Sequence, residues 1–139
     1  MYNGAVVAKK VFNLQSKEYQ KLALANSNKN NIFMREIEIW NKIKSHPFIL
    51  QFYGASHITQ HPFIVSEYCS QGTVKSYLNK KGIQLNKKLQ IMHDIALGFY
   101  HLHKSKVIHG DIKSDNVLIT DNGTPKICDF GLSIYISKK

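Results

Sequence analysis

The sequence predicts an α+β protein built from two unequal parts, and three observations lead to this prediction. Hydrophobic residues make up 43% and charged residues 20% of the 139 residues, which is the range of a globular domain. The first half combines short strand-like runs with one helical pattern. The second half is mostly helical and closes with a small hairpin signature. We therefore expect the two parts to join near residues 67–72.

The first half begins with a turn signal, and the apolar run from Ala5 to Ala8 predicts a strand that continues through Phe12. A helix is predicted from about Ile32 to Lys44, because its apolar residues fall on one arc at 100° per residue. That arc contains Phe33, Ile37, Trp40 and Ile43. Glu36 lies within the same arc, and an acid on an apolar face needs a partner, because burying a lone carboxylate is costly.

Two further strands are expected, at residues 49–53 and 63–68, and Gly54 ends the first of them. A short helix is expected over residues 74–78. A longer helix follows, with Asn86 as its expected N-cap. Residues 117–119 and 126–128 flank an Asp-Asn-Gly-Thr sequence and predict a β-hairpin.

The charge and the cysteines exclude several classes of protein. The net charge is +10, but the lysines are spread along the chain, and Arg35 is the only arginine, so nucleic-acid binding is not expected as the main function. Cys69 and Cys128 form no CxxC pair, and the histidines lack companions at ligand spacing, so we expect no structural metal site. Two free thiols and no apolar run of membrane-spanning length indicate a cytoplasmic protein.

The most informative segment is His109-Gly110-Asp111-Ile112-Lys113-Ser114-Asp115-Asn116. It resembles the catalytic loop of eukaryotic protein kinases, written H-R-D-x-K-x-x-N. Thirteen residues after Asn116, Asp129-Phe130-Gly131 resembles the D-F-G of the same family. The joint match in order and spacing is far more specific than either motif alone, and it implies a partial two-lobe protein-kinase fold.

The resemblance implies a role for each matching residue. Phosphoryl transfer depends on positioning and on neutralising charge. Asp111 is expected to orient the attacking hydroxyl and to accept its proton, while Lys113 places a positive charge near the transferred group. Mg²⁺ prefers hard oxygen ligands, and Asn116 and Asp129 match the two metal ligands of the family. The expected cofactors are therefore ATP and Mg²⁺.

Val7-Ala8-Lys9-Lys10 resembles the V-A-I-K of a kinase strand, with Lys9 in place of the apolar third residue. Lys10 then matches the catalytic lysine that contacts the α- and β-phosphates. Glu36 matches its glutamate partner, in agreement with the position of that acid on the apolar helix face.

The resemblance also assigns the adenine pocket. Ser66 is expected at the back of the pocket, with backbone groups of Glu67 and Cys69 bonding the adenine edge. Ala8 and Leu118 would enclose the ring from its two faces. Four further residues match the apolar spine that links the two lobes: Trp40, Phe52, His109 and Phe130.

The chain also departs from the family pattern. No Gly-rich loop precedes Lys10, and only eight residues follow Gly131, so we expect a partial domain truncated at both ends. Its small lobe would span residues 1–69 and the beginning of its large lobe residues 70–139. Gly110 replaces the arginine that pairs with a phosphorylated activation loop in most kinases, so control by that route is not expected.

The expected function is transfer of the γ-phosphoryl group of ATP to a Ser/Thr hydroxyl of a protein substrate, with a resemblance to the tyrosine-kinase-like group. Lys113 favours Ser/Thr over Tyr specificity. Two alternatives remain open at this point. One is a kinase-like module that binds nucleotide or a partner without catalysis, and the other is a basic binding protein that only mimics the motifs.

Overall fold

The structure is a computed structural model that describes residues 6–13, 15–17, 20, 31–58 and 61–137. Three antiparallel strands form its main sheet in the order β1-β3-β2, namely β1 (Val7–Val11), β3 (Phe63–Glu67) and β2 (Phe52–Ser56). Lys10 pairs with Ile64, and Ala8 pairs with Ser66. A bulge between Phe52 and Gly54 shifts the register of β2. The strand predicted from Ala5 through Phe12 is β1 over Val7–Val11, and Ala5 lies outside the described residues.

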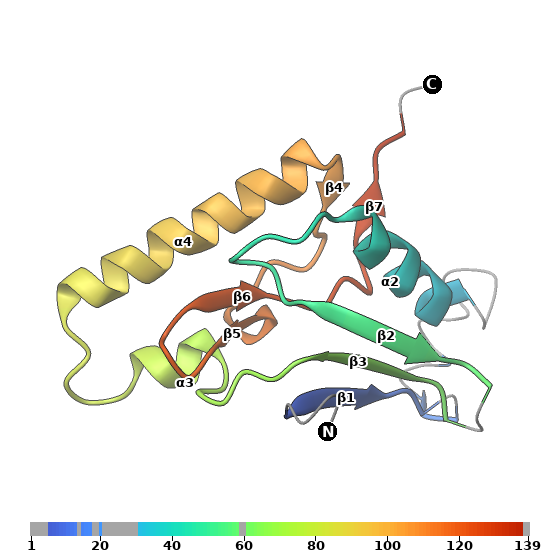
Figure 1. The fold of residues 1–139 in the computed structure, drawn as a ribbon, viewed down its shortest axis with the longest axis horizontal. Coiled ribbons are helices and arrows are strands. Elements are labelled where there is room, and N and C mark those ends of the chain that lie inside the picture. The colour runs from blue at the N-terminus through green and yellow to red at the C-terminus, as the bar shows by residue number, and fades with distance from the viewer. Residues whose placement is uncertain (1–5, 14, 18–19, 21–30, 59–60, 138–139) are drawn as a thin grey trace.

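Helix α2 (Asn31–Lys42) packs beside β2, as Figure 1 shows. Of the four apolar residues that the periodicity places on one arc, Phe33, Trp40 and Ile43 are buried, with Phe33 3% and Trp40 6% exposed, and Ile37 is partly buried. Glu36 is 1% exposed on the same side, so the predicted burial of an acid on the apolar face is confirmed.

The second part of the chain is built around α4 (Leu85–Lys104), the long helix in Figure 1. Helix α3 (Val74–Leu78) precedes it, and the side chain of Thr73 caps α3 by accepting a 3.2 Å hydrogen bond from the Ser76 backbone. The C-terminal half of α4 passes close to the hairpin. A Cβ on Gly98 would lie 2.7 Å from Ile127 Cδ1, so glycine permits this approach. No helix in the described residues is long and apolar enough to span a membrane.

Two small sheets complete the fold. Strands β5 (Val117–Ile119) and β6 (Pro125–Ile127) form the predicted hairpin, preceded by the 3₁₀ turn η1 (Ser114–Asn116). Strand β4 (Val107–Ile108) precedes the hairpin in the sequence and β7 (Ile134–Tyr135) follows it. The two strands pair antiparallel. The loop before β2 joins the hairpin to the main sheet, because the Leu50 N–H donates to the Ile127 carbonyl at 2.9 Å.

Two predictions about individual elements were wrong. The run at residues 49–53 was expected to be a strand, but the strand spans Phe52–Ser56, and Ile49 makes only an isolated bridge to Ile127. These apolar residues are buried because they cross between the sheets, which periodicity does not distinguish from a strand. The N-cap of α4 is Gln84 and not Asn86, so the helix begins with Leu85, which is 68% exposed.

Candidate active site

Three charged side chains from distant parts of the chain meet beside the main sheet. Lys10 Nζ, on β1, donates to Glu36 Oε1 at 2.8 Å and Oε2 at 3.1 Å, and to Asp129 Oδ1 at 3.2 Å. Burial alone would lower the pKa of Lys10, but attraction to Glu36 and Asp129 outweighs burial, so the pKa is raised and the amine stays charged. Burial raises the pKa of Glu36, and Lys10 opposes that shift.

A second cluster lies in the predicted catalytic loop. Lys113 Nζ donates to Asp111 Oδ2 at 2.7 Å, and Asn116 Nδ2 donates to the same oxygen at 2.9 Å and to the Asp111 carbonyl at 2.8 Å. The hydrogen bonds from Lys113 and then from Asn116 lower the pKa of Asp111. Asp111 is thus an ionised acceptor whose carboxylate is held in one orientation.

The backbone at Asp129 is strained in a way that the sequence did not indicate. Its φ of 66° lies in the left-handed region, which side-chain-bearing residues seldom occupy. Asp129 Oδ1 accepts from Lys10 and also from the Gly131 backbone at 3.5 Å. Strain of this kind is typical of functional sites, and here it accompanies a carboxylate directed toward Lys10.

A cavity of about 290 Å³ is lined by Lys10, Glu36 and Asp129, and Asn116 of the second cluster also lines it. Its lining combines apolar side chains with charged ones, a combination that suits a planar base attached to an anionic chain. Seven residues assigned to the nucleotide site from the sequence line it: Ala8, Lys10, Glu36, Ser66, Asn116, Leu118 and Asp129. Glu67, Cys69, Asp111 and Lys113 were also assigned to the site but are not part of this lining.

Asn116 and Asp129, the two lining residues that the resemblance assigns to a metal, carry oxygen atoms of the kind that a hard divalent cation takes. Asp129 supplies a carboxylate, and Asn116 uses its amide nitrogen on Asp111, so its amide oxygen is the atom left to coordinate a cation. Among the described residues, no group of three or more His, Cys, Asp or Glu side chains is placed to hold a metal ion. A cation here would therefore need further oxygen ligands, such as phosphate or water.

Four aromatic rings, three of them buried and that of Phe52 partly buried, connect the main sheet to the catalytic loop. Trp40 stands 5.4 Å from Phe52 and 5.3 Å from Phe130, and Phe130 lies 5.5 Å from His109 between ring centroids. His109 Nε2 donates to the Cys128 carbonyl at 2.9 Å, and Trp40 Nε1 donates to the Leu50 carbonyl at 3.0 Å. The four residues matched to the apolar spine from the sequence are therefore in contact one after another.

Glu67 has a further contact that the sequence did not reveal. Its carboxylate lies 3.0 Å from Lys126 Nζ, and both side chains are largely buried. The same carboxylate accepts from the Gln51 backbone at 3.3 Å. This ion pair links β3 to β6, so it fixes the end of the main sheet relative to the hairpin. Opposite charges on separate strands give no local sequence signal.

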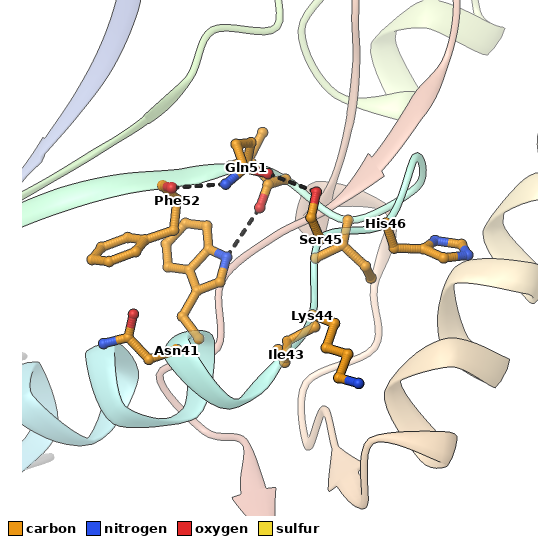
Figure 2. A pocket seen from close by; sticks show the side chains of 10 residues that line it. Asn41, Ile43, Lys44, Ser45, His46, Gln51 and Phe52 are labelled. Carbon is orange, nitrogen blue, oxygen red and sulfur yellow. Dashed lines mark hydrogen bonds between the residues drawn. The ribbon is translucent and has the colours of Figure 1, made fainter.

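A second, smaller cavity of about 150 Å³ lies where α2 leads into β2, and Figure 2 shows its lining. Ser45 Oγ donates to Gln51 Oε1 at 3.0 Å, and Gln51 Nε2 donates to the Phe52 carbonyl at 2.9 Å. These polar groups form hydrogen bonds with one another along the cavity wall, so they stabilise the loop between α2 and β2.

Gly110 also has a structural reason to be glycine. Its φ is 80°, and a Cβ built there would lie 2.4 Å from the Leu132 carbonyl oxygen. The backbone after His109 therefore touches the backbone after the Asp-Phe-Gly motif, and any side chain would force them apart.

Comparison with known proteins agrees with this geometry. A family model described as the protein kinase domain matches residues 2–139. The chain is 37% identical over 74% of its length to a probable serine/threonine-protein kinase of Dictyostelium discoideum and 36% identical over 74% to the serine/threonine-protein kinase CTR1 of Arabidopsis thaliana. It is 32% identical over 95% of its length to the receptor-type guanylate cyclase gcy-28 of Caenorhabditis elegans.

The chain spans only 12%, 13% and 10% of the lengths of these three relatives. The match nonetheless takes in the Lys10–Glu36 pair, the catalytic-loop cluster and the Asp-Phe-Gly motif. The chain therefore belongs to the protein kinase domain family.

Proposed function

We propose that this chain binds Mg²⁺-ATP and catalyses transfer of the γ-phosphoryl group to a Ser or Thr hydroxyl of a protein. The observation that supports this best is the meeting of Lys10, Glu36 and Asp129 at one cavity, with Asn116 on the same lining. One cation and two carboxylates around a cavity form a site for a polyphosphate together with a divalent metal.

In this proposal, each residue has a defined task. Lys10, oriented by Glu36, holds the α- and β-phosphates. Asn116 and Asp129 would hold Mg²⁺, which neutralises phosphate charge when it is bound. Ala8 and Leu118 enclose the base, Ser66 leaves room behind it, and backbone groups of Glu67 and Cys69 bond its edge.

Asp111 is the proposed acceptor of the hydroxyl proton. Its lowered pKa keeps it ionised at neutral pH, and the bonds from Lys113 and Asn116 fix its orientation. Lys113 sits 2.7 Å from Asp111, so its positive charge would lie near the transferred group as well.

We also propose a boundary between the two lobes and a cellular location for the chain. Residues 1–69 would form the small lobe and residues 70–139 the beginning of the large lobe. Cys69 and Cys128 are both free thiols, which suits the reducing cytoplasm.

A second function is favoured by a specific observation. One of the matches, which covers 95% of this chain, is to a protein named as a receptor-type guanylate cyclase and not as a kinase, while the serine/threonine-protein kinase KIC1 of Saccharomyces cerevisiae matches over 97%. A chain of this family could therefore serve as a nucleotide-binding or partner-binding module without phosphoryl transfer.

One experiment distinguishes a chain that transfers the phosphoryl group from a chain that only binds nucleotide. The purified chain is incubated with Mg²⁺-ATP labelled in the γ-phosphate and a generic acceptor protein, beside the Asp111→Asn variant. Transfer that Asp111→Asn abolishes supports catalysis. A thermal shift with Mg²⁺-ATP that is lost in Asp129→Ala, without transfer, supports the binding module. Absence of both the shift and the transfer refutes the proposed function.

A further inference from the structure

Arg35 is the one arginine of the chain, and it lies on α2 immediately before Glu36. Its Nη2 donates to the backbone carbonyl of Ser133 at 3.0 Å, across 98 positions of sequence, in a partly buried setting. A guanidinium presents several N–H donors in a rigid plane, so it can hold a carbonyl in a fixed direction better than a lysine amine can.

Ser133 is itself fixed on the side of the catalytic loop. It is 0% exposed, and its Oγ donates to the His109 carbonyl at 2.7 Å. Its N–H donates to the Phe130 carbonyl at 3.0 Å. The carbonyl that Arg35 bonds is therefore attached to the catalytic loop and to the Asp-Phe-Gly motif.

Helix α2 contacts the same segment at a second point. Lys42 Nζ lies 4.3 Å from the centre of the Tyr135 ring. Arg35 and Lys42 are seven positions apart, which is about two helical turns, so both side chains leave α2 on the same side. Figure 1 shows α2 next to β7, which contains Tyr135.

Arg35 and Glu36 are adjacent but bond different parts of the molecule. Glu36 bonds Lys10 on β1, and Arg35 bonds the segment after the Asp-Phe-Gly motif. Displacement of α2 away from Ser133 would carry Glu36 with it and lengthen the Lys10–Glu36 pair.

We propose that Arg35 is a positioning residue that holds α2 against Ser133, so that Glu36 stays within reach of Lys10. The consequence for nucleotide binding rests on the proposed function, whereas the consequence for the position of α2 does not. The sole tryptophan of the chain, Trp40, lies on α2 one turn after Glu36 and is 6% exposed, so its fluorescence reports that position directly.

The test compares the wild-type chain with Arg35→Gln and Arg35→Lys. Lys44→Gln is the matched control, because it also removes one positive charge, here from an exposed position beyond the end of α2. Acrylamide quenching of Trp40 is measured without nucleotide at a temperature where far-UV circular dichroism is identical for all proteins. Affinity for Mg²⁺-ATP is then measured by titration calorimetry.

Arg35→Gln is expected to increase quenching about twofold or more, because Trp40 becomes more accessible. It is expected to weaken Mg²⁺-ATP binding about fivefold, the usual effect of losing one hydrogen bond. Arg35→Lys, which retains the charge and carries its donors on a longer side chain than glutamine does, should fall between the wild type and Arg35→Gln in both measurements. Lys44→Gln should match the wild type.

A second comparison, in the Glu36→Gln background, tests whether Arg35 acts on nucleotide binding through Glu36. If Arg35 acts through Glu36, then adding Arg35→Gln to Glu36→Gln changes affinity by much less than it does in the wild type. An equal loss in both backgrounds would overturn the proposal, and so would wild-type quenching in Arg35→Gln. If Arg35→Gln does not fold, Arg35→Lys replaces it: increased quenching of Trp40 in that variant supports the proposal, and wild-type quenching overturns it. Failure of the wild-type chain to bind nucleotide would refute the proposed function, and quenching would still decide the role of Arg35.

Discussion

The imidazole rings of His46 and His101 stack with their centroids 4.3 Å apart and their planes 20° from parallel. His46 lies in the loop after α2, and Figure 2 shows its side chain pointing toward α4, which carries His101. His101 Nε2 donates to the Lys44 carbonyl at 3.0 Å, and His46 Nδ1 accepts from the Phe48 N–H at 3.3 Å. The pair thus joins the loop before the main sheet to the long helix.

This stack predicts a loss of stability in mild acid. Burial first, and then the positive charges of His101 and Lys126, lower the pKa of His46 from its ordinary value of 6.5. A histidine with a lowered folded-state pKa binds its proton more readily when unfolded, so stability is full above pH 6.5 and falls as the pH drops below it. His46→Phe keeps an aromatic ring and should remove part of that fall.

Urea unfolding at pH 5.5 and pH 7.5 checks this prediction. His103→Phe, at an exposed position on α4, is the control and should keep the wild-type pH dependence. An unchanged difference between the two pH values in His46→Phe would show that another group is responsible.

Lys10→Met is expected to weaken Mg²⁺-ATP binding about tenfold to a hundredfold, because it removes a charged hydrogen-bond donor. It also leaves Glu36, 1% exposed, without its cation, so the pKa of Glu36 should rise further. A carboxyl with a raised folded-state pKa destabilises the fold as the pH rises through that value. The variant should therefore lose stability as the pH rises above the ordinary Glu value of 4.5, as measured by urea unfolding, whereas Lys75→Met should not.

Gly110→Ala is expected to destabilise the chain by about 1–3 kcal/mol through strain at a positive φ, with an added cost from the Leu132 carbonyl. Gly54→Ala is the matched control, because no atom lies within 4 Å of a Cβ at that position. Urea unfolding of the two variants measures the difference. Equal stabilities would mean that the backbone at Gly110 relaxes freely.

Lys113→Met should raise the pKa of Asp111, because the hydrogen bond from Lys113 is the largest cause of its lowering. Carbon-detected NMR titration of the Asp111 carboxyl measures this change directly. Any stability from this bond is present above the ordinary Asp value of 3.8 and is lost as the pH falls below it. Lys126→Met, which removes a lysine that does not bond Asp111, should leave the titration unchanged.

Both thiols should resist alkylation in the folded chain. Burial raises the pKa of Cys69 to about 11 and that of Cys128 to about 12, so almost no thiolate exists at pH 7.5. Mass spectrometry after treatment with iodoacetamide should show slow labelling in buffer and rapid labelling in 6 M guanidinium chloride, a concentration at which ordinary domains of roughly this size are unfolded. Rapid labelling of Cys128 in buffer would contradict its burial.

The sequence predicted those parts of the fold and site that have local signals. Periodicity located α2 and the burial of Glu36, and turn residues located the hairpin. The buried run at residues 49–50 was misassigned because a segment that crosses between sheets is as apolar as a strand. The His46–His101 stack was missed because the two residues come together only through tertiary packing.

The contacts around the site likewise divide into those with a sequence motif and those without one. Motif spacing matched Lys10, Asp111, Asn116 and Asp129 to the family, and the contacts among them follow from that match. The Arg35–Ser133 bond and the Glu67–Lys126 pair have no motif, because one uses a backbone carbonyl and the other joins charges on separate strands.

The bond between Lys10 and Asp129 spans 119 positions of a 139-residue chain. Contacts between such distant residues carry a large loop-closure cost and form late in folding. During synthesis, which proceeds from the N-terminus, β1 leaves the ribosome long before Asp129 exists. Until then Glu36 is the only one of the two carboxylate partners that Lys10 can meet, so we expect the Lys10–Glu36 pair to form before Asp129 joins it.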